Sequence, residues 1–150
     1  MDAASMRDIE WECEQLILRF YWCLDDQLYD ELAGLFSETG AWVRLGKELI
    51  GPQQIRAAMN ERQNWITAHV VTNLQITVKS PTEAASSQYV TLYRHEDWGA
   101  KDGPAPVVLP LGILRHRDQL VCVDGTWKFQ RKTSRAVMVD RTRVTHYDKR

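Results

Sequence analysis

The chain has 150 residues, of which 44% are hydrophobic and 26% are charged. This balance predicts one globular domain over residues 1–150, long enough to bury a real core. The formal net charge of −1 argues against nucleic acid as a partner, and no apolar run approaches the roughly 18 residues that a membrane span requires. Three cysteines without paired or metal-type spacing, together with an acidic start unlike a secretory signal, favour a cytoplasmic location.

A long amphipathic helix is the first predicted element. Apolar residues recur at helical spacing from Ile9 to Leu24. Ser5, followed by Asp8 three residues later, resembles a capping box, which predicts that the helix begins there.

The end of this helix carries two carboxylates. Asp25 lies one turn after Tyr21, at the edge of the apolar stripe, whereas Asp26 lies on the wetter side. Asp25 is therefore the carboxylate that we expect to be buried.

Shorter elements follow this helix. Leucines between residues 28 and 36 predict a second, short helix, and Gly51-Pro52 predicts the start of a third, because proline is favoured in a first turn. Between these helices, residues 41–45 and 48–50 should form a small hairpin around Gly46-Lys47.

From His69 onward the sequence changes to β-rich runs, at residues 69–79, 84–95, 107–123 and 126–139. The dipeptide Asp124-Gly125 readily takes the positive φ angles of a tight turn, so the last two runs should form a hairpin. Helices followed by long strands predict an α+β domain in which a curved sheet wraps around the helices. Such a sheet can enclose a pocket.

The clearest candidates for chemistry are His69 and Asp25. A neutral imidazole can take a proton near pH 7, and a carboxylate on its other ring nitrogen would fix the tautomer and stabilise the imidazolium. The alternatives are that His69 is a hydrogen-bonded core histidine and that Asp25 is a solvated carboxylate at a helix end.

The alternation around His69 is not consistent along its strand. Val71 and Asn73 share its side, but Leu74, Ile76 and Val78 have the opposite parity. Three explanations are open: His69 faces outward, both faces are covered, or a bulge shifts the phase.

Aromatic residues are abundant, with six tryptophans and five tyrosines. Tyr21, Trp42, Trp65 and Tyr93 are candidate walls of a pocket for a flat apolar ligand, although each could equally be a core residue. Asn73 would add an amide beside His69.

Two further groups of polar residues need an interpretation. Arg94 could donate to an oxygen that gains charge during a reaction, but an exposed strand arginine is commoner. The triplets His95-Glu96-Asp97 and His116-Arg117-Asp118 contain metal-ligand residue types, yet such residues at loop edges are usually solvated. We therefore expect no metal and no cofactor.

Four segments together resemble a SnoaL-like member of the nuclear transport factor 2-like superfamily (cystatin-like), and their order covers nearly the whole chain. The segments are residues 20–25 (FYWCLD) with 32–36, residues 51–55 (GPQQI), residues 69–73 (HVVTN) and residues 124–129 (DGTWKF). This resemblance implies a cone-shaped, curved mixed or antiparallel sheet around three N-terminal helices.

The resemblance also implies a site and an activity. Relatives with this Asp and His pattern include scytalone dehydratase and a dehydrochlorinase, in which the matching residues form a catalytic dyad. Asp25 and His69 would inherit those roles. Counted forward from His69, the second histidine of scytalone dehydratases falls on Arg94, and Leu24 stands where they have a tyrosine.

A second resemblance favours a different class of protein. Residues 92–94 (LYR), residues 114–118 (LRHRD) and Trp127 are similar to the small subunit of ring-hydroxylating dioxygenases, which shares this fold and usually has no catalytic role. That alternative implies a non-catalytic or ligand-binding chain with a large partner.

Our functional hypothesis from the sequence is a small cofactor-independent lyase, similar to scytalone dehydratase, or an isomerase. His69, oriented by Asp25, would remove a carbon-bound proton from a small aromatic or alicyclic substrate. The strand pattern also predicts a homo-oligomer formed through the sheet.

Overall fold

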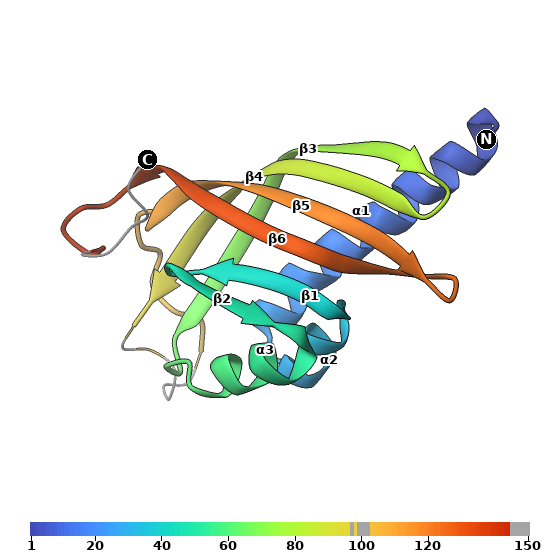
Figure 1. Cartoon of the computed structure of the whole chain (residues 1–150). Coiled ribbons are helices and arrows are strands. Elements are labelled where there is room, and N and C mark those ends of the chain that lie inside the picture. Colours follow the sequence, from blue (N-terminus) through green and yellow to red (C-terminus); the bar gives the residue numbers. More distant parts are fainter. Residues whose placement is uncertain (97, 99–102, 145–150) are drawn as a thin grey trace.

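The computed structural model describes residues 1–96, 98 and 103–144 (Figure 1). It confirms the α+β class, with helices and strands in the predicted order. Within the described residues the elements are α1 Ala3–Asp25, α2 Tyr29–Gly34, β1 Phe36–Arg44, β2 Lys47–Ile50, α3 Gly51–Asn60, β3 Ile66–Ser80, β4 Glu83–His95, β5 Gly112–Val123 and β6 Thr126–Val139.

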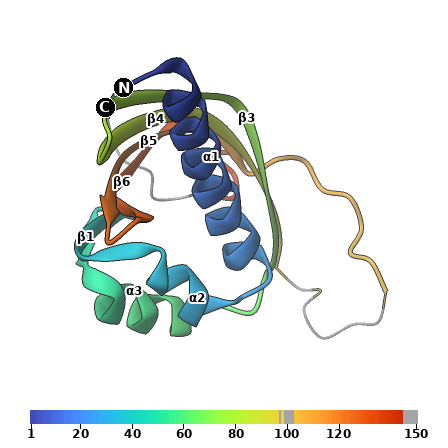
Figure 2. The same cartoon turned by 90° about the vertical axis from the view of Figure 1, so that its right-hand side faces the viewer.

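The strands form one curved, unclosed sheet in the order β2-β1-β6-β5-β4-β3. Neighbouring strands are antiparallel except β1 and β6, which pair in parallel, so the sheet is mixed. Helix α1 lies in the hollow of the sheet and contacts β3 and β6, while α2 and α3 pack together beside β1 (Figure 2). This arrangement confirms the cone of curved sheet around helices.

Helix α1 begins earlier than the sequence suggested. Its N-cap is Asp2, whose carboxylate accepts a hydrogen bond of 2.8 Å from the backbone N–H of Ser5. The prediction of a Ser5 capping box was therefore wrong: Ser5 lies in the first turn as a donor. Asp2, directly before the first helical residue Ala3, satisfies one of the unpaired N–H groups of the first turn.

The core lies between α1 and the sheet. Phe20 at its centre is fully buried and makes edge-to-face contacts with Tyr21, Trp42 and Phe129, at centroid distances of 5.1, 5.1 and 5.5 Å. Burying one such aromatic side chain contributes about 1.5–3 kcal/mol. All three cysteines are free, and burial raises the pKa of the Cys13 thiol to about 12.

A β-bulge in β3 resolves the inconsistent alternation around His69. The register passes from Thr72 opposite Tyr89 to Gln75 opposite Ser87, which leaves one extra residue on β3. Asn73 lies in this bulge with a φ of 52°, a conformation that asparagine tolerates better than most residues. Because of the extra residue, the apolar side chains on both sides of the bulge face the core: Val71, Leu74 and Ile76.

The predicted strand 107–123 is shorter in the structure, where β5 begins at Gly112. Pro110 lacks the N–H group that a strand would donate, and Val107 and Leu109 are exposed. The hairpin turn itself is confirmed. Asp124 and Gly125 have φ angles of 49° and 78°, and Val123 pairs with Thr126.

Strands β1 and β6 approach each other closely at Gly40. A Cβ at this position would lie 2.5 Å from the backbone carbonyl oxygen of Phe129, which cannot move without distorting the sheet. We expect Gly40→Ala to lower the free energy of unfolding by about 1–3 kcal/mol, measured by urea denaturation. Gly34→Ala is the control, because a Cβ there meets nothing within 4 Å; equal losses in both variants would contradict the close approach.

Candidate active site

Asp25, the last residue of α1, is held against β3 by hydrogen bonds to both of its oxygens. Its Oδ1 accepts from the hydroxyl of Thr67 at 2.8 Å and lies 2.6 Å from Nδ1 of His69. Its Oδ2 accepts from the backbone N–H of His69 at 2.8 Å. Asp25 is thus part-buried, as the helical spacing predicted, while Asp26 is exposed.

This contact defines the tautomer of His69. A carboxylate can only accept, so Nδ1 carries the proton and Nε2 carries the lone pair. Nε2 has no hydrogen-bond partner among the described residues, and the His69 side chain, only 9% exposed, lines a cavity. A base with its lone pair open to a ligand-sized cavity is the arrangement that proton abstraction needs.

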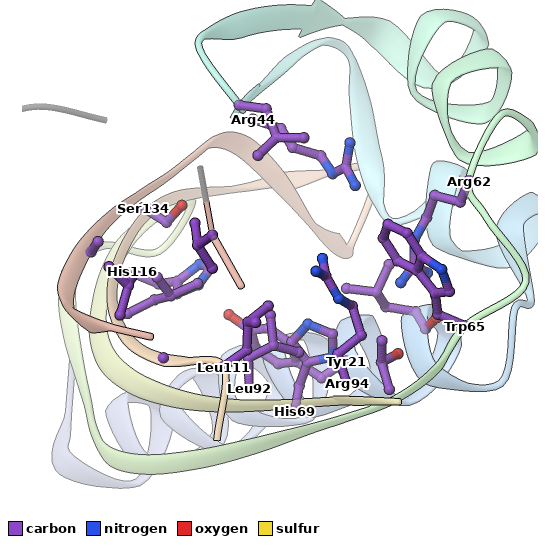
Figure 3. A pocket seen from close by; sticks show the side chains of 18 of the residues that line it. Tyr21, Arg44, Arg62, Trp65, His69, Leu92, Arg94, Leu111, His116 and Ser134 are labelled. Atoms are coloured by element: carbon purple, nitrogen blue, oxygen red, sulfur yellow. The ribbon is translucent and has the colours of Figure 1, made fainter. Parts of the chain in front are cut away.

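The cavity has a volume of about 400 Å³ and lies between α1 and the concave face of the sheet. Its walls are mainly apolar (Figure 3). Of the residues predicted to contact a substrate, it is lined by Tyr21, Trp42, Trp65 and Arg94. A space of this size and character suits a small ring compound.

Two of the predicted substrate contacts lie elsewhere. Asn73 is exposed in the bulge of β3, where the extra residue turns it away from the face that carries His69. Tyr93 is absent from the lining of the cavity, since its neighbours Leu92 and Arg94 face inward and side chains alternate along a strand. Neither side chain therefore lines this cavity.

His116 also lines the cavity, a position that the sequence analysis did not predict. It lies on β5, only 6% exposed, and neither ring nitrogen has a hydrogen-bond partner within the described part of the chain. Tyr21 contacts both histidines, at centroid distances of 5.7 Å to His69 and 5.7 Å to His116. Burial, and then the positive charge of Lys132, hold the pKa of His116 well below 6.5.

The alternation along β5 could have indicated this position, because Gly112, Leu114 and His116 all face the cavity. The alternative of a metal site finds no support in the described residues, which contain no group of three or more metal-ligating side chains. Asp118, which was considered together with His116, instead pairs with Lys132.

Lys132 and Asp118 form a fully buried ion pair beside the cavity. The Lys132 ammonium lies 3.2 and 3.1 Å from the two oxygens of Asp118, and 4.4 to 4.8 Å from the ring centroids of Phe20, Tyr21 and Phe129. The side chains of Ser86 and Gln88 also donate to Asp118, at 3.1 and 2.8 Å. Burial lowers the pKa of Lys132, and Asp118 opposes this shift.

The fold and this site define a cone-shaped α+β protein with a partly open, mainly apolar cavity. The family model of the SnoaL-like domain matches residues 6–133, and the chain belongs to that family. No curated protein sequence matches the chain. No helix in residues 1–96, 98 and 103–144 is long and apolar enough to cross a membrane.

Solved structures with the same fold include a candidate scytalone dehydratase from Novosphingobium aromaticivorans. It is 24% identical, with a TM-score of 0.77 over 98% of this chain and 96% of that one. A hexachlorocyclohexane dehydrochlorinase from Novosphingobium barchaimii is 16% identical, with a TM-score of 0.78 over 93% of each chain. A nuclear transport factor 2-like protein with a cystatin-like fold, also from N. aromaticivorans, is 19% identical, with a TM-score of 0.73 over 90% and 87%.

The buried ion pair gives a stability prediction. Lys132→Met leaves Asp118 buried without its counterion, and we expect a loss of about 3–5 kcal/mol in the free energy of unfolding, measured by urea denaturation. The matched control is Arg131→Met, which breaks an exposed pair with Glu48 and should cost less than about 1 kcal/mol. Replacing Asp118 by Leu as well should restore much of the stability; similar losses in both single variants would contradict this account.

The environment of His116 predicts how stability depends on pH. Because the folded state holds the pKa of His116 well below 6.5, the unfolded chain binds a proton first as the pH falls. The contribution of His116 is therefore complete above pH 6.5 and is lost below it, by up to about 1.4 kcal/mol per pH unit. In urea unfolding between pH 7 and 5, His116→Gln should flatten this slope; an unchanged slope would contradict a neutral, buried His116.

Proposed function

We propose that this protein is a small lyase or isomerase in which His69 removes a carbon-bound proton from a ring substrate. The observation that carries the proposal is the 2.6 Å contact between Asp25 and Nδ1 of His69, with Nε2 left open to the cavity. The shared fold with a dehydrochlorinase and a candidate scytalone dehydratase is in keeping with such chemistry.

In the first step, Nε2 of His69 takes the proton, and the electron pair of the broken C–H bond moves toward the neighbouring carbon. If that carbon bears a leaving group, the pair forms a double bond and the group departs with its own bonding electrons. If it does not, the proton returns at another carbon and the double bond shifts. Asp25 stabilises the imidazolium that both routes form.

The apolar walls assist this step in two ways. They lower the local dielectric constant, which strengthens the interaction between the Asp25 carboxylate and the imidazolium. Trp42 and Trp65, both in the lining, present flat surfaces against which a ring can be oriented. A small aromatic or alicyclic molecule is therefore the class of substrate that this cavity favours.

A general probe tests the base without knowledge of the natural substrate. When a base removes the carbon-bound proton of 5-nitrobenzisoxazole, the N–O bond breaks and a coloured cyanophenolate forms. We expect turnover of this probe to fall by about 100-fold or more in His69→Gln, and by roughly tenfold or more in Asp25→Asn, because the asparagine misorients the imidazole.

The control is His95→Gln, which removes a histidine that does not line the cavity. It should retain the wild-type rate, and circular dichroism should show that all the variants are folded. A wild-type rate no higher than that of His69→Gln would overturn the proposal.

A further inference from the structure

Arginines gather at one end of the cavity. Arg44 comes from β1, Arg62 follows α3, Arg94 lies on β4 and Arg143 follows β6, and all four line the cavity. Figure 3 shows Arg44, Arg62 and Arg94 pointing into the same space from different elements, away from His116 and Ser134. Three chain segments thus bring positive charge to the same part of the cavity.

Arg44 and Arg62 form no ion pair with a carboxylate in residues 1–96, 98 and 103–144. Arg94 pairs with Glu96, with 2.9 Å between its Nε and the carboxylate. Within the described ranges, Arg62 donates only to the carbonyl of Leu24 and the hydroxyl of Tyr29, at 2.9 and 3.2 Å. Neutral oxygens of this kind satisfy N–H groups, but they do not cancel a charge.

Arg143 is bonded in the same way as Arg62. Its guanidinium donates to the carbonyl oxygens of Leu109 and Arg94, at 3.3 and 2.5 Å. It forms no ion pair with a carboxylate in the part of the chain that the structure describes. The Asp140 carboxylate is close enough for the charge of Arg143 to help lower its pKa, so Arg143 is partly compensated.

Arg44 is the least compensated of the four. It makes no hydrogen bond to any residue of the described chain, and its guanidinium carbon lies 5.6 Å from the ring centroid of Trp42. Burial, and then the positive charge of Arg62, lower the pKa of Arg44. Partial burial of a guanidinium without a carboxylate partner is unfavourable, and an anion in the cavity would offset that cost.

The opposite end of the cavity has a different chemistry. His116 is buried and neutral, and both of its nitrogens lack a partner in the described protein. A neutral imidazole can exchange a hydrogen bond with a hydroxyl or a carbonyl group, and an unpaired buried polar group costs about 1–3 kcal/mol. A ligand that fills the cavity would therefore meet arginines at one end and a neutral hydrogen-bonding group at the other.

We propose that the cavity binds a cyclic organic acid whose carboxylate is held by Arg44 and Arg62, and whose far end carries a hydroxyl or carbonyl group that hydrogen-bonds to His116. A carboxylate matches the planar guanidinium fork and supplies the missing negative charge. The ring would lie between Trp42 and Leu92 on the apolar walls, above His69. This assignment of substrate class rests on the proposed function, because it places the substrate in the same cavity.

Two probes that differ only in charge test the carboxylate site. Calorimetric titration with 2-naphthoate and with 2-naphthalenemethanol near pH 7 compares an acid with the alcohol of the same shape. We expect the wild-type protein to bind the acid about tenfold more tightly, and Arg44→Gln to lose most of that preference with little change for the alcohol. Arg135→Gln, which removes the same charge from an exposed position outside the cavity, should keep the preference.

The outcomes separate this proposal from the proposed function. Failure of 2-naphthoate to bind, or equal binding of acid and alcohol, or a preference that survives Arg44→Gln would overturn the carboxylate site. These measurements need no turnover and can be repeated in His69→Gln, where the preference should persist. If the benzisoxazole assay showed that His69 is not the base, the binding result would still stand. If the carboxylate site were disproved, the role of His69 as a base would still stand.

A third probe tests the far end of the ligand. We expect 6-hydroxy-2-naphthoate to bind several-fold more tightly than 2-naphthoate, and His116→Phe to abolish that advantage while it retains the preference for acid over alcohol. No advantage of the hydroxyl in the wild-type protein, or an equal advantage in His116→Phe, would overturn the role of His116.

Discussion

The hydrogen bonds of Asp25 join the end of α1 to β3 and thereby set the geometry of the cavity. One carboxylate binds the hydroxyl of Thr67, the backbone N–H of His69 and the His69 ring. Because both oxygens are engaged, the helix end cannot rotate or slide without breaking several contacts at once. The same bonds fix the histidine tautomer, so the position of the helix and the chemistry of the site depend on one residue.

The second constraint is the buried ion pair of Lys132 and Asp118 beside the cavity. Lys132 would be costly in an apolar core, but Asp118 neutralises it and three aromatic rings contact its ammonium. Its charge in turn disfavours a proton on His116. The cavity therefore contains two histidines in different electrostatic environments. His69 lies beside the Asp25 carboxylate, and His116 lies near the Lys132 ammonium. Such a difference allows two titratable groups to have different roles.

The formal net charge of −1 hides the uneven distribution of charge. Arginines remote in the sequence line one end of the cavity, while most acidic side chains lie at the surface or in ion pairs. Net charge describes the average field of the molecule and says nothing of a local one. An apolar cavity with a cationic end can select its ligands even though the protein as a whole is almost neutral.

The sequence by itself determined the long helix and the Asp124-Gly125 hairpin, because these depend on local periodicity and turn chemistry. The pairing of Asp25 with His69, which are 44 residues apart, was predicted from the family resemblance, because no local pattern specifies a contact of that range. Only the tertiary structure decided which strand residues face the cavity. A bulge at Asn73 shifts the alternation of β3, and another in the last hairpin places Lys132 opposite Asp118, where uninterrupted counting from the turn gives Arg131. A bulge moves every later side chain of its strand to the opposite face of the sheet, and the sequence around the bulge carries no clear signal.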